Sequence, residues 1–216
     1  MTTRTARLYL VTPPLGDPTA FLRDLGAALD AGDIAALLLR LEAADERTLI
    51  NRAKSVAAVV QRRDVALLLD GHAELTARAG ADGAHLFGIA ALTEAIGMLK
   101  PDRIAGAGGL RSRHDAMLAG EAAADYVMFG DPDRHGSRPP VEAIAERLAW
   151  WSELFELPCV GYAGSRDEIA PLAQAGADFI ALGEWIWTQS EAPAAAVAAA
   201  GALVAAEPAT GAGLDL

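Results

Sequence analysis

The chain has 216 residues, of which 52% are hydrophobic, and it carries a formal net charge of -11. This length suits a single domain with a sizeable core. The acidic balance argues against nucleic acid as a partner, because a protein that neutralises phosphates needs a basic face. The single cysteine, Cys159, excludes a disulfide framework and indicates a reducing, cytoplasmic location. No apolar stretch reaches the ~18 residues of a membrane helix, and the N-terminal one is too short for a signal peptide.

Short apolar runs alternate with helical stretches along the chain. In chain order, strands are expected at residues 7–12, 34–39, 65–70, 83–87, 103–108, 126–129, 159–164 and 179–182. These runs are nearly continuous rather than alternating, as in parallel strands that are buried on both faces. Helices are expected at residues 19–31, 45–61, 72–79, 91–99, 112–121, 140–155, 166–175 and 192–206.

A repeat runs through this pattern. Every second strand is preceded by two small residues and an aspartate, at Asp33, Asp82, Asp125 and Asp178. A Gly or Ala that ends a helix and leads directly into an apolar strand is typical of an αβ connection.

Eight strand–helix units with a period of two units predict a single (βα)8 TIM barrel with parallel strands, over residues 1–206. An open, doubly wound sheet is the alternative that the same alternation allows. The last ten residues, 207–216, have no core signal and are expected to fray. In a (βα)8 barrel, functional residues lie at the C-terminal ends of the strands and in the loops that follow them.

Glycines at two such ends suggest a phosphate site. Gly164 and Ser165 follow the seventh strand and Gly183 follows the eighth, and backbone N–H groups of these loops commonly bind phosphate in barrels of this type. The alternative is that these glycines only form tight turns, since Arg166 is the one basic residue beside them.

Charged residues follow the second and third strands. Arg40 ends the run LLLR and could bind an anion bidentately; alternatively it pairs with Glu42 at the rim. Asp70, His72 and Glu74 could hold a metal or transfer a proton, although helix capping is the favoured role for Asp70.

The fourth and sixth strands supply two further candidates. His85 lies inside GAHLF and is expected to be a packed, hydrogen-bonded side chain. Asp131 begins the polar loop 130–136, which either closes over a ligand, with Asp131 as acid–base, or is a solvated turn. We name Asp131 and His72 as the candidate catalytic residues. Arg40, Asp70, Gly164, Ser165 and Gly183 are the candidate ligand-binding residues.

Several of these motifs together resemble one family. The segments LYLVT, LLLR, LTARAGADGAHL, ADYVMFG and QAGADFIALG follow the order and spacing of the thiamine phosphate synthase and thiazole tautomerase family over nearly the whole chain. The resemblance implies a (βα)8 barrel. It also implies the synthase reaction, in which hydroxymethylpyrimidine diphosphate and thiazole phosphate give thiamine phosphate and pyrophosphate with the help of magnesium.

The resemblance carries over to the site only in part. Arg40 matches the family's diphosphate-binding arginine, whereas the basic residue two places later is Glu42. Gly71 and Ala90 stand where the family has its two metal-binding acids, and residues 131–135 replace the family's Pro-Thr-x-Thr-Lys loop. Ala163-Gly164 stands at the family's Gly-Gly of strand seven, and Glu184 stands at its serine of strand eight. The resemblance therefore implies that the chain has lost its magnesium ligands, and no cofactor is expected.

Three functions stay open from the sequence. The first is thiamine phosphate synthase activity, a transferase reaction. The second is a tautomerase that needs no metal, because the YVxFG signature of strand six is present as YVMFG with Asp131 at the following histidine position. The third is a barrel without catalysis that binds a small ligand or a partner protein. The expected partner is a small phosphorylated molecule, with no nucleic acid and no membrane; a homo-oligomer stays open.

Overall fold

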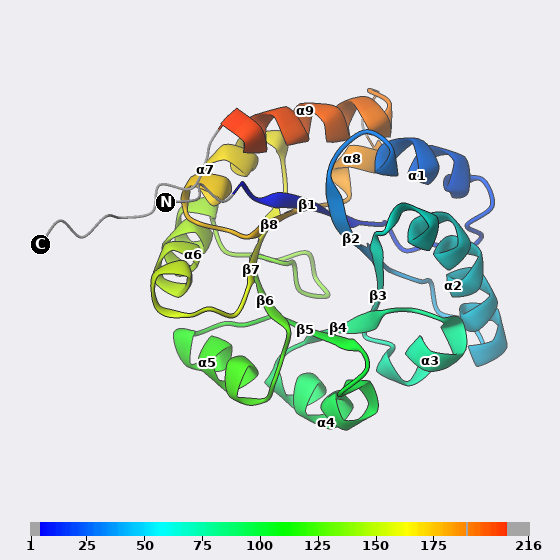
Figure 1. The fold of residues 1–216 in the computed structure, drawn as a ribbon, viewed down its shortest axis with the longest axis horizontal. Coiled ribbons are helices and arrows are strands. Elements are labelled where there is room, and N and C mark those ends of the chain that lie inside the picture. Colours follow the sequence, from blue (N-terminus) through cyan, green and yellow to red (C-terminus); the bar gives the residue numbers. More distant parts are fainter. Residues whose placement is uncertain (1–4, 189, 207–216) are drawn as a thin grey trace, which may run out of the picture.

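The protein is described by a computed structural model, which covers residues 5–188 and 190–206. The tail predicted at residues 207–216 lies outside this range. In the described part of the chain, eight parallel strands close into a barrel in sequence order, and helices surround it (Figure 1). The strands are β1 (Arg7–Val11), β2 (Ile34–Leu39), β3 (Ala66–Asp70), β4 (Gly83–Phe87), β5 (Ile104–Gly108), β6 (Tyr126–Phe129), β7 (Cys159–Ala163) and β8 (Phe179–Leu182). The predicted barrel is confirmed, and the open sheet is excluded because β8 pairs with β1.

The outer layer consists of α1 (Phe21–Leu29), α2 (Glu46–Val60), α3 (Thr76–Ala79), α4 (Ile89–Leu99), α5 (Arg113–Glu121), α6 (Val141–Leu154), α7 (Ile169–Gln174), α8 (Trp185–Thr188) and α9 (Pro193–Ala206). Short 3-10 turns precede α3 at Ala73–Leu75 and α7 at Arg166–Glu168, and one follows α2 at Gln61–Arg63. Helix α9 closes the layer between α7 and α1 (Figure 1). Within the described residues, no helix is long and apolar enough to cross a bilayer.

The expected helices differ from the observed ones mainly at their ends. The helix expected at 19–31 begins at Phe21, because the Asp17 carboxylate accepts both the N–H and the hydroxyl of Thr19 and holds that residue in a turn. The helices expected at 72–79 and 166–175 both begin as 3-10 turns. The short α8 was not predicted, because WIWT directly follows a strand and is too short to show a helical period.

The core has two shells. Leucine, alanine and valine side chains fill the space between the sheet and the helices, while a second cluster fills the barrel itself. The inner cluster is Tyr9, Val11, Ala36, Leu38, Leu68, Tyr126, Met128, Val160, Tyr162 and Ala181. Alternate residues of each strand point inward, so these side chains stack in layers below the C-terminal mouth. Gly106 leaves room for the Tyr126 ring, into which a Cβ at that position would project.

The repeated aspartates tie neighbouring strands together. The Asp82 carboxylate accepts the Leu67 N–H of β3 at 2.7 Å, and Asp125 accepts the Ala105 N–H of β5 at 2.7 Å. Asp178 likewise accepts the Cys159 N–H of β7 at 2.8 Å. Asp33 departs from the pattern and binds the Arg7 guanidinium instead. At β4, β6 and β8, the repeat therefore encodes a clamp to the backbone of the odd strand before it.

Replacing Asp82 with alanine is expected to lower the free energy of unfolding by about 1–3 kcal/mol, because the half-buried Leu67 N–H loses an acceptor. Urea denaturation followed by circular dichroism measures the loss. Asp102→Ala is the control, since Asp102 is exposed near the same end of the barrel. Equal unfolding free energies for the two variants would contradict the clamp.

Candidate functional site

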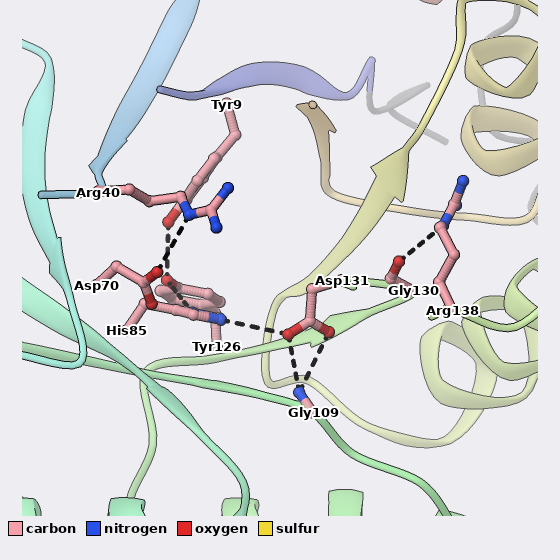
Figure 2. A network of polar contacts seen from close by, with 9 residues as sticks. All are labelled: Tyr9, Arg40, Asp70, His85, Gly109, Tyr126, Gly130, Asp131 and Arg138. Carbon is pink, nitrogen blue, oxygen red and sulfur yellow. Dashed lines mark hydrogen bonds and ion pairs between the residues drawn. The ribbon is translucent and has the colours of Figure 1, made fainter. Parts of the chain in front are cut away.

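Arg40, Asp70, His85 and Asp131 meet at the C-terminal mouth of the barrel (Figure 2). They line a small cavity of about 60 Å³ over the barrel axis, whose other walls are Val11, Leu38, Phe87, Met128, Pro132 and Tyr162. Phe87 and Asp131 also border a larger cavity of about 390 Å³ under the loop between β6 and α6. The structure thus brings together three of the predicted site residues, Arg40, Asp70 and Asp131.

Two carboxylates neutralise Arg40. Its Nε lies 3.4 Å from Asp70 Oδ2, and its Nη1 forms an ion pair with Glu184, which follows β8. The alternative pairing with Glu42 is therefore not the one observed. The favoured capping role of Asp70 is also wrong, because the turn after β3 begins at His72 without a side-chain cap and Asp70 instead lies beside Arg40.

His72 lies apart from this group. Its Nδ1 contacts Glu74 Oε1 at 3.3 Å, and His72 is not among the described residues that line either cavity bordered by Asp131. The predicted catalytic pair of His72 and Asp131 is therefore not assembled by the fold. The reason is geometric: the loop after β3 turns at Gly71, which has a φ of +73°, and carries the next side chain toward the 3-10 turn.

His85 is the histidine that faces Asp131. The expectation that His85 is packed and hydrogen-bonded is correct, since it is 2% exposed and its Nδ1 lies 2.8 Å from Tyr126 Oη. Its Nε2 lies 3.7 Å from Asp131 Oδ2 and has no hydrogen-bond partner among the described residues. The alternation of strand residues could have shown this, because 83, 85 and 87 share the inward face of β4.

Asp131 is fixed by the backbone around it. Its two carboxylate oxygens accept the Gly109 N–H at 3.2 and 2.9 Å, and its side chain is 11% exposed. Gly130 has a φ of +91°, which turns the chain sharply after β6 and places Asp131 over the mouth. A side chain at Gly108 would collide with both His85 and Asp131. Asp131 itself is therefore shielded from solvent, whereas residues 134–136 of the same loop form the exposed turn that the alternative described.

Two buried tyrosines complete the chain of hydrogen bonds below His85. Tyr9 Oη lies 3.0 Å from Tyr126 Oη, which in turn contacts His85 Nδ1 (Figure 2). If Tyr9 donates to Tyr126 and Tyr126 donates to His85, every hydroxyl proton has an acceptor. That arrangement leaves the His85 proton on Nε2, where it points toward Asp131.

Burial raises the pKa of all three tyrosines of the chain. Desolvation is the main cause at Tyr9, Tyr126 and Tyr162, and the nearby carboxylates of Asp70 and Asp131 add to it at the first two. The hydroxyls of the network therefore stay protonated far above neutral pH.

Raised tyrosine pKa values predict an alkaline limit to stability. An acid whose pKa is higher in the folded chain stabilises the fold fully below its unfolded value, 10.0 for tyrosine, and this contribution is lost as the pH rises above that value. We expect phenolate absorbance to rise only together with loss of the helical circular dichroism signal. Phenolate that forms near the ordinary tyrosine pKa in a still-folded protein would contradict this burial.

The predicted phosphate cradle is already occupied by groups of the chain. The Gly164 N–H donates to Glu168 Oε2 at 2.7 Å, and the Gly183 N–H donates to the Ala163 carbonyl at 3.1 Å. Ser165 is exposed at the start of the following 3-10 turn. The expectation of a phosphate on the Gly164 and Gly183 N–H groups therefore does not match these hydrogen bonds.

Arg138 was missed by the sequence analysis. It lies in the loop after β6, beyond the 131–135 segment, and its side chain crosses to β7 (Figure 2). It forms an ion pair with Glu168 at 2.8 Å and donates from Nε to the Gly130 carbonyl at 3.0 Å. Nothing local in the sequence separates Arg138 from Arg134, which is exposed in the same loop.

Two tryptophans, Trp185 and Trp187, hold the ends of strands. Trp185 Nε1 donates to the Ala163 carbonyl at 3.0 Å, and Trp187 Nε1 donates to the Val11 carbonyl at 2.8 Å. Trp151 is 1% exposed and packs between Phe129 and Phe155. Cys159 is buried in the core.

The residues of the mouth do not fit a magnesium ion. Gly71 and Ala90, the positions at which the family resemblance places the metal-binding acids, carry no oxygen ligand in their side chains. Asp70 already contacts Arg40. Within residues 5–188 and 190–206, no three His, Cys, Asp or Glu side chains are grouped so that they could hold a metal ion.

The sequence pattern of one protein family, described as thiamine monophosphate synthase, matches residues 8–186. The chain belongs to this family. Among its relatives, the thiamine-phosphate synthase of Rhodospirillum centenum is 45% identical over 195 residues, which cover 89% of this chain and 94% of the relative. The thiamine-phosphate synthase of Hyphomonas neptunium is 42% identical over 208 residues, which cover 91% of this chain and 93% of the relative.

A solved structure has the same fold. The thiamine phosphate pyrophosphorylase of Pyrococcus furiosus superposes with a TM-score of 0.76 at 22% identity and covers 94% of this chain and 98% of its own. The family resemblance read from the sequence motifs is therefore confirmed.

Proposed function

We propose that this chain is an acid–base catalyst of thiamine biosynthesis, which moves a proton on a small thiazole-type molecule without a divalent cation. The pathway is suggested by the names of its relatives, thiamine-phosphate synthases of 45% and 42% identity. The reaction type is suggested by the arrangement of Asp131, a shielded carboxylate at the junction of the two cavities of the barrel mouth.

Asp131 has the surroundings that a general base needs. The Gly109 N–H fixes both of its oxygens, so that the carboxylate needs no reorganisation to accept a proton. It is 11% exposed, and it borders both cavities in which a substrate atom could lie. In a tautomerisation, Asp131 would take a proton from one atom of the substrate and return it to another, so that the reaction balances without a co-reactant.

His85 would assist as a hydrogen-bond donor. With Tyr126 donating to its Nδ1, His85 carries its proton on Nε2, which faces the cavity. The Nε2 atom lies 3.7 Å from Asp131 Oδ2. From this position, His85 could hydrogen-bond the negative charge that develops on the substrate when Asp131 removes its proton. Because the imidazole is buried, the donor is held in one orientation.

The synthase condensation is the second candidate, which Arg40 and the names of the relatives favour. A diphosphate leaving group needs cationic compensation. The Arg40 guanidinium at the mouth is paired with both Asp70 and Glu184, and the side chains that would bind magnesium are missing. These observations support proton transfer over condensation.

The two candidates differ in their need for metal. The purified full chain would be given the thiazole isomer on which the family's tautomerases act, in EDTA. In parallel it would be given hydroxymethylpyrimidine diphosphate and thiazole phosphate, with magnesium. If the chain catalyses proton transfer, the first assay should show isomerisation at a rate that EDTA does not lower. The second assay should then yield no thiamine phosphate. Magnesium-dependent thiamine phosphate, or no isomerisation, would overturn the proposal.

A further inference from the structure

Another cavity lies inside the barrel at the end opposite the mouth. It has a volume of about 310 Å³ and reaches from the N-terminal ends of the strands to Tyr9 and Tyr126. In the described part of the chain, it shares no lining residue with the small cavity at the mouth, which is formed by the next layer of side chains. Because bulky branched side chains normally fill a TIM barrel in layers, a cavity at this depth needs a local cause.

Small side chains on neighbouring strands create this cavity. Ala36 of β2 and Ala66 of β3 are paired in register, and Ala36 is also paired with Tyr9 of β1. All three residues line the cavity. Because an alanine side chain ends at its Cβ, the two adjacent strands leave empty the volume that leucine or isoleucine side chains would fill. The sequence of β2 and β3 therefore builds the hollow.

The walls of this cavity are apolar and rich in aromatic rings. The rings of Tyr9 and Tyr126 have centroids 6.0 Å apart and an interplanar angle of 64°, and the half-buried Phe179 lies at the strand ends. Leu68 and Val160 line the space between them. Aromatic side chains favour edge-to-face and offset contacts with a further ring, and an apolar cavity of about 150 Å³ is already large enough to bind benzene. Size and lining therefore fit a single aromatic ring.

The polar groups that line the cavity already have partners within the chain. The two tyrosine hydroxyls bond to each other and to His85. The charged residues of the lining, Arg7 and Asp125, form ion pairs with Asp33 and Lys100 respectively. A charged ligand would lose its hydration and would have to compete with these pairs, whereas a neutral ring gains by leaving water. The lining therefore favours an uncharged ligand.

We infer that the N-terminal end of the barrel is a second binding site, which takes a neutral ligand with one aromatic ring against Tyr9 and Tyr126. The network of Tyr9, Tyr126 and His85 separates this site from the mouth (Figure 2). The inference goes beyond the proposed function and does not depend on it, because His85 and Asp131 line the mouth and not this cavity.

Titration with toluene tests the inference, and benzoate serves as a charged probe of similar shape. Each would be titrated into the 15N-labelled full chain while the amide signals of Ala36 and Ala66 are compared with that of Gly109 at the mouth. The variants are Ala66→Leu, which fills the cavity, the milder Ala36→Val, and Ala58→Leu as the matched control, because Ala58 is exposed on α2. Thermal melts confirm that each variant is folded.

We expect toluene to cause its largest shifts at Ala36 and Ala66, and benzoate to bind at least about tenfold more weakly. Ala66→Leu should weaken toluene binding at least about tenfold, Ala36→Val by a smaller factor, and Ala58→Leu not at all.

The inference would be overturned if the unaltered chain bound no toluene, if the largest shift fell on Gly109, or if benzoate bound equally well. A folded Ala66→Leu with unchanged affinity would also contradict it. If Ala66→Leu does not fold, Ala36→Val and the comparison of the two probes decide. These readouts are independent of turnover, so they stand apart from the outcome of the isomerisation assay.

Discussion

Asp131→Asn is expected to slow isomerisation of the thiazole substrate about 10²–10⁴-fold, the usual contribution of a positioned general base. Asparagine keeps the shape of the side chain and an oxygen acceptor for the Gly109 N–H, but it does not accept the substrate proton. The loss should therefore appear mainly in kcat, with little change in the melting temperature. Steady-state kinetics with the thiazole isomer measures it.

The control for this variant is Asp102→Asn. Asp102 is an exposed acid just before β5, at the opposite end of the barrel from the mouth, so its loss changes the net charge equally without touching the site. If the two variants isomerise the substrate at the same rate, Asp131 is not the base.

Tyr126→Phe is the substitution from which we expect the largest combined effect on stability and rate. The change removes the hydroxyl that lies between Tyr9 Oη and His85 Nδ1 and so leaves two buried polar atoms without this partner. Each such loss costs about 1–3 kcal/mol. His85 would also lose the donor that keeps its proton on Nε2, so the rate should fall beyond what unfolding explains.

Tyr9→Phe provides the comparison for Tyr126→Phe, because it removes one hydroxyl of the network and leaves the Tyr126–His85 contact of 2.8 Å in place. Urea unfolding gives the stabilities, and 15N chemical shifts of the His85 ring report which nitrogen carries the proton. An unchanged tautomer and rate in Tyr126→Phe would show that the tyrosines only fill the barrel.

The fold was predictable because its signals are local. Each strand is an apolar run of four to six residues, and each of the eight predicted strands was found within one residue of its observed ends. The aspartate repeat marked the even strands, although its physical role, a bond to the N–H of the preceding strand, needed the structure. Helix α8 escaped because four residues cannot show a period.

The site was predictable only where position along a strand decides it. Arg40, Asp70 and Asp131 were found because they end or follow strands, and His85 could have been added from the inward parity of β4. The ion pairs of the site could not be derived from the sequence. Arg40 meets Glu184 from 144 positions away, and Arg138 meets Glu168 from 30 positions away. No local pattern encodes such contacts, and they decide which donors are free for a ligand.

Three expectations concern properties beyond the fold and the site. They are the cytoplasmic location, the absence of nucleic acid and membrane partners, and the question of a homo-oligomer. All three rest on composition and charge, and they stay predictions. The net charge of -11 is reflected at the mouth in Arg40 and Arg138, which are both paired with acids of the same chain.

Proton exchange with solvent tests the central claim most directly. The full chain and Asp131→Asn would be incubated with the thiazole isomer in deuterium oxide and EDTA, and deuterium in the substrate and product would be followed by NMR. Transfer through the Asp131 carboxylate predicts deuterium incorporation by the unaltered chain at a rate that EDTA leaves unchanged, and almost none by the variant. Incorporation that stops in EDTA, or that proceeds equally in Asp131→Asn, would contradict it.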